Sequence, residues 1–426
     1  METRANLFQA TNHATRWVAI VDAYSSGNLL APEFNSRGFE CVHIQSTPQL
    51  PAPAHGSFHA KDFRSNIVHQ GQIEETLEHC QQFNLQCLIA GSETGVELAD
   101  LLSERLGLRS NGSKLSACRR NKFQMVEQVS RNGLKTIPSL RTSDSKLALS
   151  WIEEVTGWPV VVKPLRSAGT DSVRVCSSAS EFLTVFEANL GKRDKFGQRI
   201  DDLLIQKTIR GGEYIIDAVS CDGQHHVTNV WLIVKGVHNN ADFVCEYNQL
   251  LDHDEAVKNG SVEYALNVIT ALGIRHGPTH TEIYRTPEGP ILIECASRLH
   301  GGGFPIYSKE CVGYGQVDLT ADAYLDVEAF HKKAQAPYQR GKHLFIAELI
   351  SDVEGPLKGL CTKQIESLPS FSSIKLSVTL GDLINQTVDA FTSPGHVVLT
   401  HADFATIWRD YNYLRSIERK GLLYQV

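Results

Sequence analysis

Short apolar runs alternate with amphipathic segments over the N-terminal part of the chain. The apolar runs predict strands at residues 17–22, 40–45 and 86–90, and periodic apolar spacing predicts helices at 29–37 and 95–106. This alternation is typical of a parallel sheet covered by helices on both faces. The loop Gly91–Gly95 follows a strand end, where such sheets often bind ligands. It is either part of a binding site or an ordinary connection.

The pattern changes in the middle of the chain. A helix predicted at 117–132 is followed by Gly133 and Pro138, which indicates a passage between domains. Beyond it, strands are predicted at 158–164, 172–176, 203–206 and 213–220, with a helix at 179–190. The remainder mixes strands at 227–234, 279–285, 290–295, 344–349 and 397–400 with helices such as 260–272. We therefore predict three units, at residues 1–115, 116–222 and 223–426, in an α/β protein whose second and third units are of α+β type.

The segment Thr279–Glu294 has the pattern of a β-hairpin. Pro287 suits the second position of a type I turn, and Gly289 suits the left-handed residue that completes a three-residue loop. This loop sets Thr286 opposite Pro290.

The same register places Glu282 directly opposite Glu294, and His280 opposite Ala296, on one face of the hairpin. Two like charges facing each other destabilise a sheet unless a cation or solvent separates them. Magnesium favours one or two carboxylates together with water and substrate phosphates. The alternative is a solvated acidic hairpin, but three isoleucines are expected to be buried on the other face: Ile283, Ile291 and Ile293.

Arg298 lies four residues after Glu294 and three residues before the glycine run Gly301–Gly303. An arginine can stabilise charge that develops on a transferring phosphoryl group or a tetrahedral intermediate. Consecutive glycines allow close backbone approach to a ligand and leave side-chain space empty, although such a run can also be an ordinary loop.

The apolar strand Val160–Pro164 carries one lysine, Lys163, and leads into the small-residue loop Leu165–Ser172. Backbone amides of such a loop can hold phosphates, with Lys163 as a point charge. A Walker A loop is absent, and a plain hairpin with a lysine reaching solvent is the alternative. The strand 203–206 and the connection to Glu213 could hold adenine and ribose, or be a structural hairpin.

Composition limits the classes of partner. The formal net charge of −7 disfavours nucleic acid and anionic membranes. The apolar run at 17–21 is too short for a signal peptide, and no segment reaches the roughly 20 apolar residues that span a bilayer. The ten cysteines are scattered without a CxxC pair, which favours reduced thiols over zinc or disulfides. We expect a cytoplasmic protein.

Taken together and in this order, these segments resemble the ATP-grasp superfamily, and within it the bacterial L-amino-acid ligases that form dipeptides. The resemblance runs from the Gly91–Gly95 loop to the end of the chain. Its most specific part is Gly277–Glu282 with Glu294–Arg298, followed by Pro159–Pro164 with Ser167–Ser172, and then Gly212–Tyr214. It implies an ATP-grasp architecture: an N-terminal parallel-sheet domain, a small β-rich lid subdomain and a large mixed catalytic domain.

The resemblance also implies roles for individual residues. Contacts to ATP are implied for Lys122, Lys163, Ser167, Ala168, Gly169, Thr170, Ser172, Gln206, Lys207, Ile209 and Glu213. Glu282 and Glu294 would hold one or two magnesium ions, for which manganese could substitute, and Arg298 would stabilise an acyl phosphate. Many relatives have asparagine two residues after the second glutamate; here that position is Ala296, which weakens the expectation of a second metal.

The implied reaction is ADP-forming. The carboxylate of one amino acid attacks the γ-phosphate of ATP, and the amine of a second amino acid then displaces phosphate to give a dipeptide or a peptide-like metabolite. Amino acids are thus the expected partners, and a homodimer is possible. The substrate pocket is expected to include Glu246, His280, Gly301 and Gly302, with an ordinary surface position as the alternative for Glu246. The alternatives are a carboxylase-type enzyme that activates bicarbonate and a nucleotide-binding module without turnover.

Overall fold

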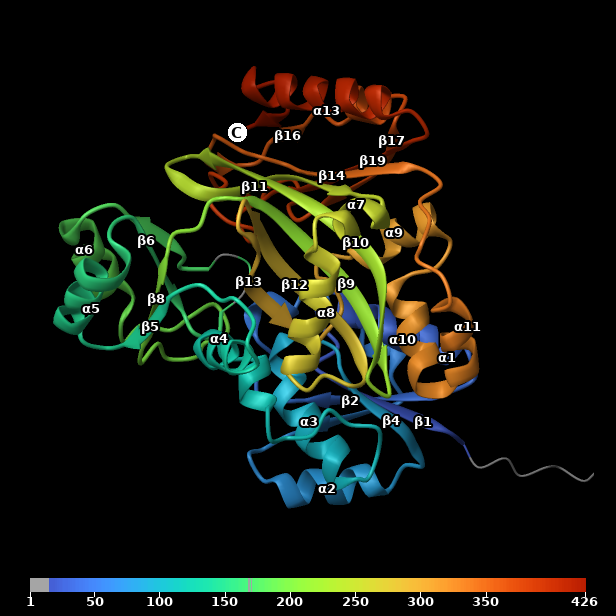
Figure 1. Cartoon of the computed structure of the whole chain (residues 1–426). Coiled ribbons are helices and arrows are strands. Elements are labelled where there is room, and N and C mark those ends of the chain that lie inside the picture. The colour runs from blue at the N-terminus through green and yellow to red at the C-terminus, as the bar shows by residue number, and fades with distance from the viewer. Residues whose placement is uncertain (1–14, 168, 170) are drawn as a thin grey trace, which may run out of the picture.

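The computed structural model describes residues 15–167, 169 and 171–426. The chain begins with a four-stranded parallel sheet of order β3-β2-β1-β4, made of Ser65–Val68, Glu40–Gln45, Trp17–Val21 and Leu85–Ala90. Helix α1 (Leu30–Ser36) packs on one face together with α10 (Gln316–Leu325), and α2 (Ile73–Gln81) and α3 (Val96–Arg105) pack on the other. The predicted parallel sheet with helices on both faces is confirmed (Figure 1).

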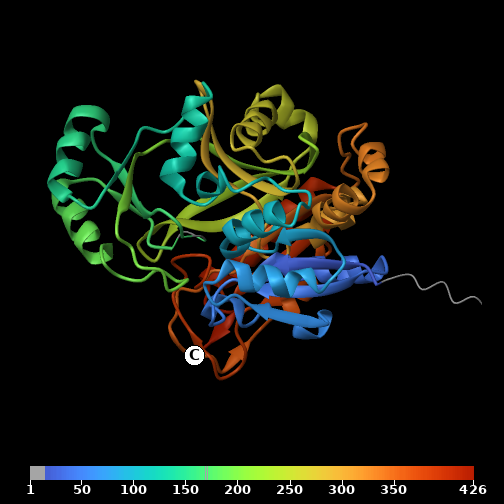
Figure 2. The same cartoon turned by 90° about the horizontal axis from the view of Figure 1, so that it is seen from below.

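A small antiparallel sheet follows, of order β5-β8-β6-β7, made of Ser139–Thr142, Leu203–Lys207, Val160–Pro164 and Arg174–Cys176. Helices α5 (Ser145–Trp151) and α6 (Ala179–Asn189) cover it, α5 through buried Ala148 and α6 through buried Phe182 and Phe186. Seen from below, this small sheet (green) lies at the left of the parallel sheet (blue) (Figure 2).

The helix predicted at 117–132 is divided in the structure. A 3-10 turn covers Ser116–Arg119, and α4 proper runs from Lys122 to Arg131. The Asn121 side chain accepts hydrogen bonds from the backbone N–H groups of Phe123 and Gln124, which fixes the first turn. This cap places Lys122 at the helix start.

The large sheet has eight strands in the order β13-β12-β9-β10-β11-β14-β19-β17. In that order they span Gly289–Ala296, Gly277–Thr286, Gly212–Cys221, Gln224–His238, Ala241–Leu250, His343–Glu348, Gly395–His401 and Phe371–Leu376. The strand predicted at 213–220 lies here as β9, between β10 and β12, rather than beside the strands of the small sheet. Its side chains Ile216 and Ala218 are buried against β10 and α8 (Ser261–Ala271), which explains the pairing.

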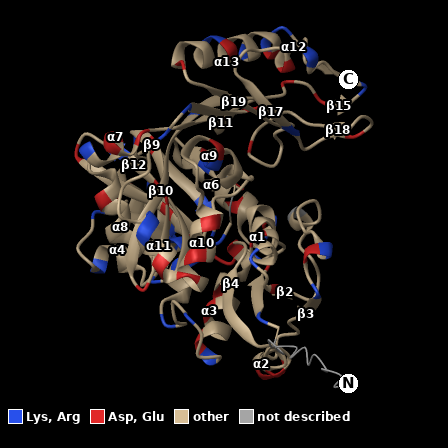
Figure 3. Ribbon diagram, turned by 90° about the vertical axis from the view of Figure 1, so that its right-hand side faces the viewer, with Lys and Arg blue, Asp and Glu red and all other residues tan. Residues whose placement is uncertain are grey.

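Six helices of the described part of the chain accompany the large sheet. They are α7 (His253–Lys258), α8, α9 (Phe304–Val312), α10, α11 (Val327–Lys333) and α13 (Phe404–Arg419). Shorter elements are β15 (Gly355–Pro356), β16 (Gly359–Leu360), α12 (Lys363–Glu366), β18 (Leu383–Ile384) and β20 (Tyr424–Gln425). Helix α13 and the C-terminus lie at one end of the molecule and α2 at the other, and acidic and basic residues are interspersed on the face in view (Figure 3).

None of the helices in the described part of the chain has both the length and the apolar character needed to cross a bilayer. All ten cysteines lie in the described part and carry free thiols.

Candidate active site

In the β12–β13 hairpin, Glu282 and Glu294 face each other as predicted, but the turn and the strand pairing next to it differ from the prediction. Its turn is one residue shorter than predicted, because Thr286 pairs with Gly289 rather than with Pro290. Gly289 has a φ of 112°, a conformation that side-chain-bearing residues rarely adopt. A β-bulge between the Glu282 and Ile283 pairs adds the missing residue to β13, so that Glu282 lies opposite Glu294 as predicted.

The bulge also changes which side chains line the site. Because of the extra residue, the consecutive Ile293 and Glu294 both line the same cavity, together with Glu282 and Tyr284 of β12. Ile293 is therefore not buried on the far face with Ile283, as we predicted, but forms an apolar part of the cavity wall.

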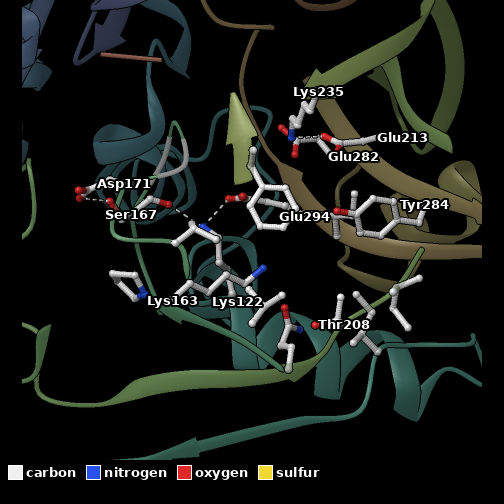
Figure 4. A pocket seen from close by; sticks show the side chains of 18 of the residues that line it. Lys122, Lys163, Ser167, Asp171, Thr208, Glu213, Lys235, Glu282, Tyr284 and Glu294 are labelled. Carbon is white, nitrogen blue, oxygen red and sulfur yellow. Dashed lines mark hydrogen bonds and ion pairs between the residues drawn. The ribbon is translucent and has the colours of Figure 1, made fainter. Parts of the chain in front are cut away.

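This first cavity lies between the small sheet and the hairpin (Figure 4). Its wall from the small sheet and α4 includes Lys122, Lys163, Ser167, Gln206, Lys207 and Ile209. The hydroxyl group of Thr208 is buried in this wall and has no hydrogen-bond partner among the described residues. A buried unpaired hydroxyl group is costly, so this end of the cavity suits a ligand with a polar edge.

Three lysines surround the carboxylates (Figure 4). The Lys122 Nζ donates to Glu294 Oε1 at 2.9 Å and to the Ser167 carbonyl oxygen at 2.6 Å. Lys235 Nζ donates to Glu213 Oε1 at 2.6 Å. Burial alone would lower the pKa of Lys235, but Glu213 and Glu282 raise it above its usual value. The cavity thus combines facing carboxylates with fixed positive charge, the arrangement that metal-bound phosphates require.

A second cavity of about 490 Å³ adjoins the first and shares Glu282, Lys235, Phe243 and Gly169 with it. It lies where the parallel sheet, the large sheet and the C-terminal part meet, and Arg298, Gly301 and Gly302 line it. Gly302 has a φ of 68°, which accounts for a glycine there.

Arg298 is held in place by the N-terminal unit. Its Nε donates to Glu93 Oε2 at 3.0 Å, and its Nη1 donates to the Leu299 carbonyl oxygen at 2.8 Å. Glu93 is buried in the loop after β4 and also pairs with Arg120. Burial would raise the pKa of Glu93, but Arg120 and Arg298 hold it well below its usual value. The loop Gly91–Gly95, which we considered as a binding loop because it follows a strand end, therefore holds Arg298 in place through Glu93.

A buried aspartate binds two of the histidines that line the second cavity. Asp217 on β9 accepts hydrogen bonds from Trp231 Nε1 at 2.9 Å, His280 Nδ1 at 3.1 Å and His300 Nδ1 at 2.8 Å. His280 Nε2 lies 3.0 Å from Glu282 Oε1. Burial would lower the pKa of His280, but its bonds to Asp217 and Glu282 raise it to about 9. His280 thus places a positive charge behind the facing carboxylates.

Comparison with known proteins identifies this arrangement. Residues 156–305 match the model of the ATP-grasp domain family. The chain is 32% identical over 406 residues to dapdiamide A synthase from Enterobacter agglomerans, covering 94% of this chain and 95% of that protein. The chain belongs to the ATP-grasp superfamily, within its L-amino-acid ligase family.

Two further relatives agree with this placement. The ligase is 22% identical over 246 residues to the L-arginine-specific L-amino acid ligase from Bacillus subtilis, covering 56% of this chain and 58% of that one. Its fold matches the crystal structure of the L-amino acid ligase from Bacillus licheniformis with a TM-score of 0.74 and 16% identity, over 95% of this chain and 98% of that one. The protein is therefore an ATP-grasp carboxylate–amine ligase.

Most of the residues singled out from the sequence converge in the two cavities of the ligase. Those lining the first are Lys122, Lys163, Ser167, Gly169, Gln206, Lys207, Ile209, Glu213, Glu282 and Glu294, and those lining the second include Gly169, His280, Glu282, Arg298, Gly301 and Gly302. Ala168 and Thr170 lie outside the described residues. Ser172 is not among the lining residues; its hydroxyl group donates to Asp171 instead.

Glu246 lies elsewhere. Its carboxylate bonds to His238 Nε2 at 2.9 Å, where the pairing of β10 with β11 is irregular, and it lines neither cavity. The irregularity turns its carboxylate toward His238, an outcome that strand periodicity cannot reveal. The wall of the second cavity instead contains Glu348, whose pKa burial raises to about 7.

Magnesium is the metal that superfamily members use, and the donor set of this ligase suits it. Two facing carboxylates in a cavity that lysines also line match the few protein ligands that Mg²⁺ takes beside substrate phosphates. Ala296 is buried and offers no ligand atom. Any second ion would therefore depend on Glu294, phosphates and water.

Several functional residues escaped the sequence analysis. Lys235 follows the end of a predicted strand, and a lysine in such an apolar run is the same signal that revealed Lys163. His300 stands between Arg298 and the glycine run, close enough to have been suspected. Glu93 was marked only as part of the loop Gly91–Gly95, and Asp217 carried no local signal, because the partners of both residues are far away in the chain.

Lys163 gives a testable pH dependence. Burial and the neighbouring charge of Lys122 lower the pKa of Lys163 to about 8, against the attraction of Glu294 and Glu282. A phosphate contact of Lys163 would need the charged form of its amine, so that above pH 8 the enzyme would take up a proton when ATP binds. We expect ATP affinity to be constant below pH 8 and to fall by up to about tenfold per pH unit above it.

Titration of ATP binding by calorimetry between about pH 7 and 9 measures this slope. The Lys163→Arg variant should lose it, because a guanidinium group stays charged throughout. An equal slope in wild type and variant would show that another group is responsible.

Proposed function

We propose that this ligase joins the carboxylate of one amino acid to the amine of a second in two steps, giving a dipeptide or a peptide-like metabolite with release of ADP. The first amino acid's carboxylate attacks the γ-phosphate of ATP and forms an acyl phosphate. The second amino acid's amine displaces phosphate from it. The names of the relatives, an L-arginine-specific L-amino acid ligase among them, support amino acids as substrates.

The meeting of the two cavities at Glu282 and Lys235 carries this proposal. Transfer of a phosphoryl group depends on positioning the donor and acceptor in line and on neutralising charge. A nucleotide in the first cavity would direct its terminal phosphate toward this junction, where a carboxylate in the second cavity can reach it. The cations Lys235 and Arg298 flank the junction and can hold that carboxylate and the transferred group.

Each part of the first cavity has a proposed task. Lys122 and Lys163 bind phosphates, and the loop from Ser167 to Ser172 covers them. The connection Gln206–Ile209 holds adenine, with the Thr208 hydroxyl group as a further polar contact, and Glu213 binds ribose. Glu282 and Glu294 hold magnesium, which neutralises the phosphate charge when it is bound.

Two alternatives are less well supported. A bicarbonate-activating enzyme has less support from the relatives, because two of them are amino-acid ligases by name, and the second cavity of about 490 Å³ falls within the roughly 300–1,000 Å³ of sites that hold organic ligands. A nucleotide-binding module without turnover would not need Arg298, fixed by Glu93 beside the junction. We keep the cytoplasmic location, the division of the chain at residues 115 and 222 and the homodimer as predictions.

ADP release measured over pairs of amino acids, with the masses of the products determined, tests the proposal. We expect ADP formation to require at least one amino acid and a product with the mass of an amide to appear with the correct pair. ADP formation with bicarbonate alone, or the absence of an amide product from every pair, would refute it.

A further inference from the structure

Amide formation needs a group that accepts a proton. An amino acid carries its amine as an ammonium ion, which has no lone pair with which to attack the acyl phosphate. A base within reach of the second cavity therefore has to remove a proton, and neutral histidine is the usual choice. His280 does not suit this task, because Asp217 and Glu282 bond to its two ring nitrogens and leave neither available.

His300 lies beside His280, with the ring centroids 4.3 Å apart, but only one of its two ring nitrogens is engaged in a hydrogen bond among the described residues. Its Nδ1 bonds to Asp217 Oδ2 at 2.8 Å, and because an aspartate carboxylate can only accept, the hydrogen of the neutral ring is on Nδ1. The ring also lines the second cavity. With its Nδ1 edge turned to Asp217, the ring presents Nε2 and its lone pair on the opposite edge, and Nε2 has no hydrogen-bond partner among the described residues.

The ring is held rigidly. It packs against Phe304 with centroids 4.3 Å apart, and the His300 backbone N–H donates to Gln316 Oε1 at 2.9 Å. Gln316 in turn donates to the Thr279 carbonyl oxygen at 2.8 Å, which ties α10 to β12. An aspartate that fixes the tautomer and orientation of a histidine is the arrangement by which hydrolases present a basic nitrogen.

The charged groups that surround His300 come from three elements. Asp217 lies on β9, His280 on β12 and Arg298 in the segment after β13, whereas the neighbours Trp231, Phe304 and Gln316 are uncharged. Burial lowers the pKa of His300 to about 4; Asp217 opposes this, and the charges of His280 and Arg298 reinforce it. Of the two histidines bonded to this aspartate, His280 thus has both ring nitrogens engaged, whereas His300 keeps Nε2 available.

We propose that His300 is the general base that deprotonates the amine of the second amino acid, with Asp217 as its positioning residue. This role rests on the two-step amide synthesis proposed above. It adds to that synthesis a catalytic residue for the second step.

Two protons leave the attacking nitrogen during amide formation. The ammonium group gives one proton to His300 Nε2, and the resulting amine forms a bond from its nitrogen to the acyl carbon. The bond from that carbon to the phosphate oxygen breaks, and the departing phosphate takes the second proton from the nitrogen. The imidazolium of His300 returns its proton to water. The negative charge of the acyl phosphate raises the pKa of His300 while the proton is being taken up, which strengthens the base at that stage.

Hydroxylamine separates the two steps, because it is an unprotonated nucleophile at neutral pH and traps the acyl phosphate as a hydroxamate without a base. We expect His300→Gln to form the hydroxamate at close to the wild-type rate and to form the amide about 10²-fold more slowly. The amide rate of this variant should increase with pH as free amine accumulates, whereas the wild-type rate should depend less on pH. His226→Gln is the matched control, since His226 is also buried with a lowered pKa but bonds to Tyr314 and lines neither cavity.

A second variant tests the base directly. His300→Ala opens space beside the second cavity, and added imidazole should restore part of its amide formation. Unchanged amide formation in His300→Gln, or an equal loss of amide and hydroxamate, would overturn the proposal. So would a transition-metal ion present in the wild type and missing from His300→Gln, since Asp217, His280 and His300 could also converge on a cation. If the wild type forms no hydroxamate with any amino acid, the proposed function itself fails.

Discussion

Replacing Glu294 with alanine is expected to abolish ADP formation, lowering kcat by about 10³-fold or more. Glu294 is one of two facing carboxylates in the first cavity, and Ala296 cannot replace it as a ligand. A bound metal ion contributes several kcal/mol to the stabilisation of a phosphoryl-transfer transition state, and each 1.36 kcal/mol corresponds to a factor of ten in rate. The variant also removes the carboxylate partner of Lys122. Steady-state ADP release at saturating magnesium measures the effect.

Glu288→Ala is the matched control, because Glu288 lies in the turn of the same hairpin, is exposed and lines neither cavity. It should turn over normally, and both variants should keep the melting behaviour of the wild type in circular dichroism. Normal turnover of Glu294→Ala would show that the metal assignment is wrong.

Replacing Arg298 with alanine is expected to cost about 3 kcal/mol of transition-state stabilisation, or roughly 10²–10³-fold in kcat, comparable to the loss of one donor to a developing oxyanion. The Arg298 guanidinium lies at the second cavity, and Glu93 fixes its orientation. Glu93 retains Arg120 as a partner in the variant, so the buried carboxylate is not left unpaired.

The kinetics of amide formation at saturating substrate measure this loss. Arg298→Lys should recover only part of it, because lysine lacks the planar fork that grips Glu93 and a phosphoryl group together. Arg275→Ala, at an exposed arginine outside both cavities, should have no effect. A near-normal rate in Arg298→Ala would remove the arginine from the catalytic machinery.

The sequence was informative wherever the structure depends on neighbours in the chain. The strands β1, β2 and β4 and the lysine of β6 follow from local pattern and spacing, whereas the ATP-grasp architecture came from the resemblance of short motifs to that superfamily. The helix start at Lys122 was misjudged by several residues, since apolar periodicity continues through the 3-10 turn while the Asn121 cap decides where the α-helix begins.

Contacts between distant segments were beyond the reach of such patterns. Glu93 and Arg298 are 205 residues apart in the chain, and Asp217 and His300 are 83 residues apart. Periodicity shows that a residue faces inward but not which residue it will meet. The misplacement of Glu246 has the same origin, because an irregular pairing of two strands rotates a side chain without altering the hydrophobic pattern.

In the β12–β13 hairpin, the short turn and the bulge change the strand register by one residue in opposite directions. The turn removes one residue from the expected register, the bulge at Ile293 restores it, and only residues beyond both regain the original phase. Deleting Ile293 would remove the bulge and leave the turn and the four pairs next to it unchanged, so that Glu294 would directly follow Leu292 and still lie opposite Glu282. The bulge therefore gives β13 one residue of spare length, which evolution or engineering can remove without separating the two carboxylates.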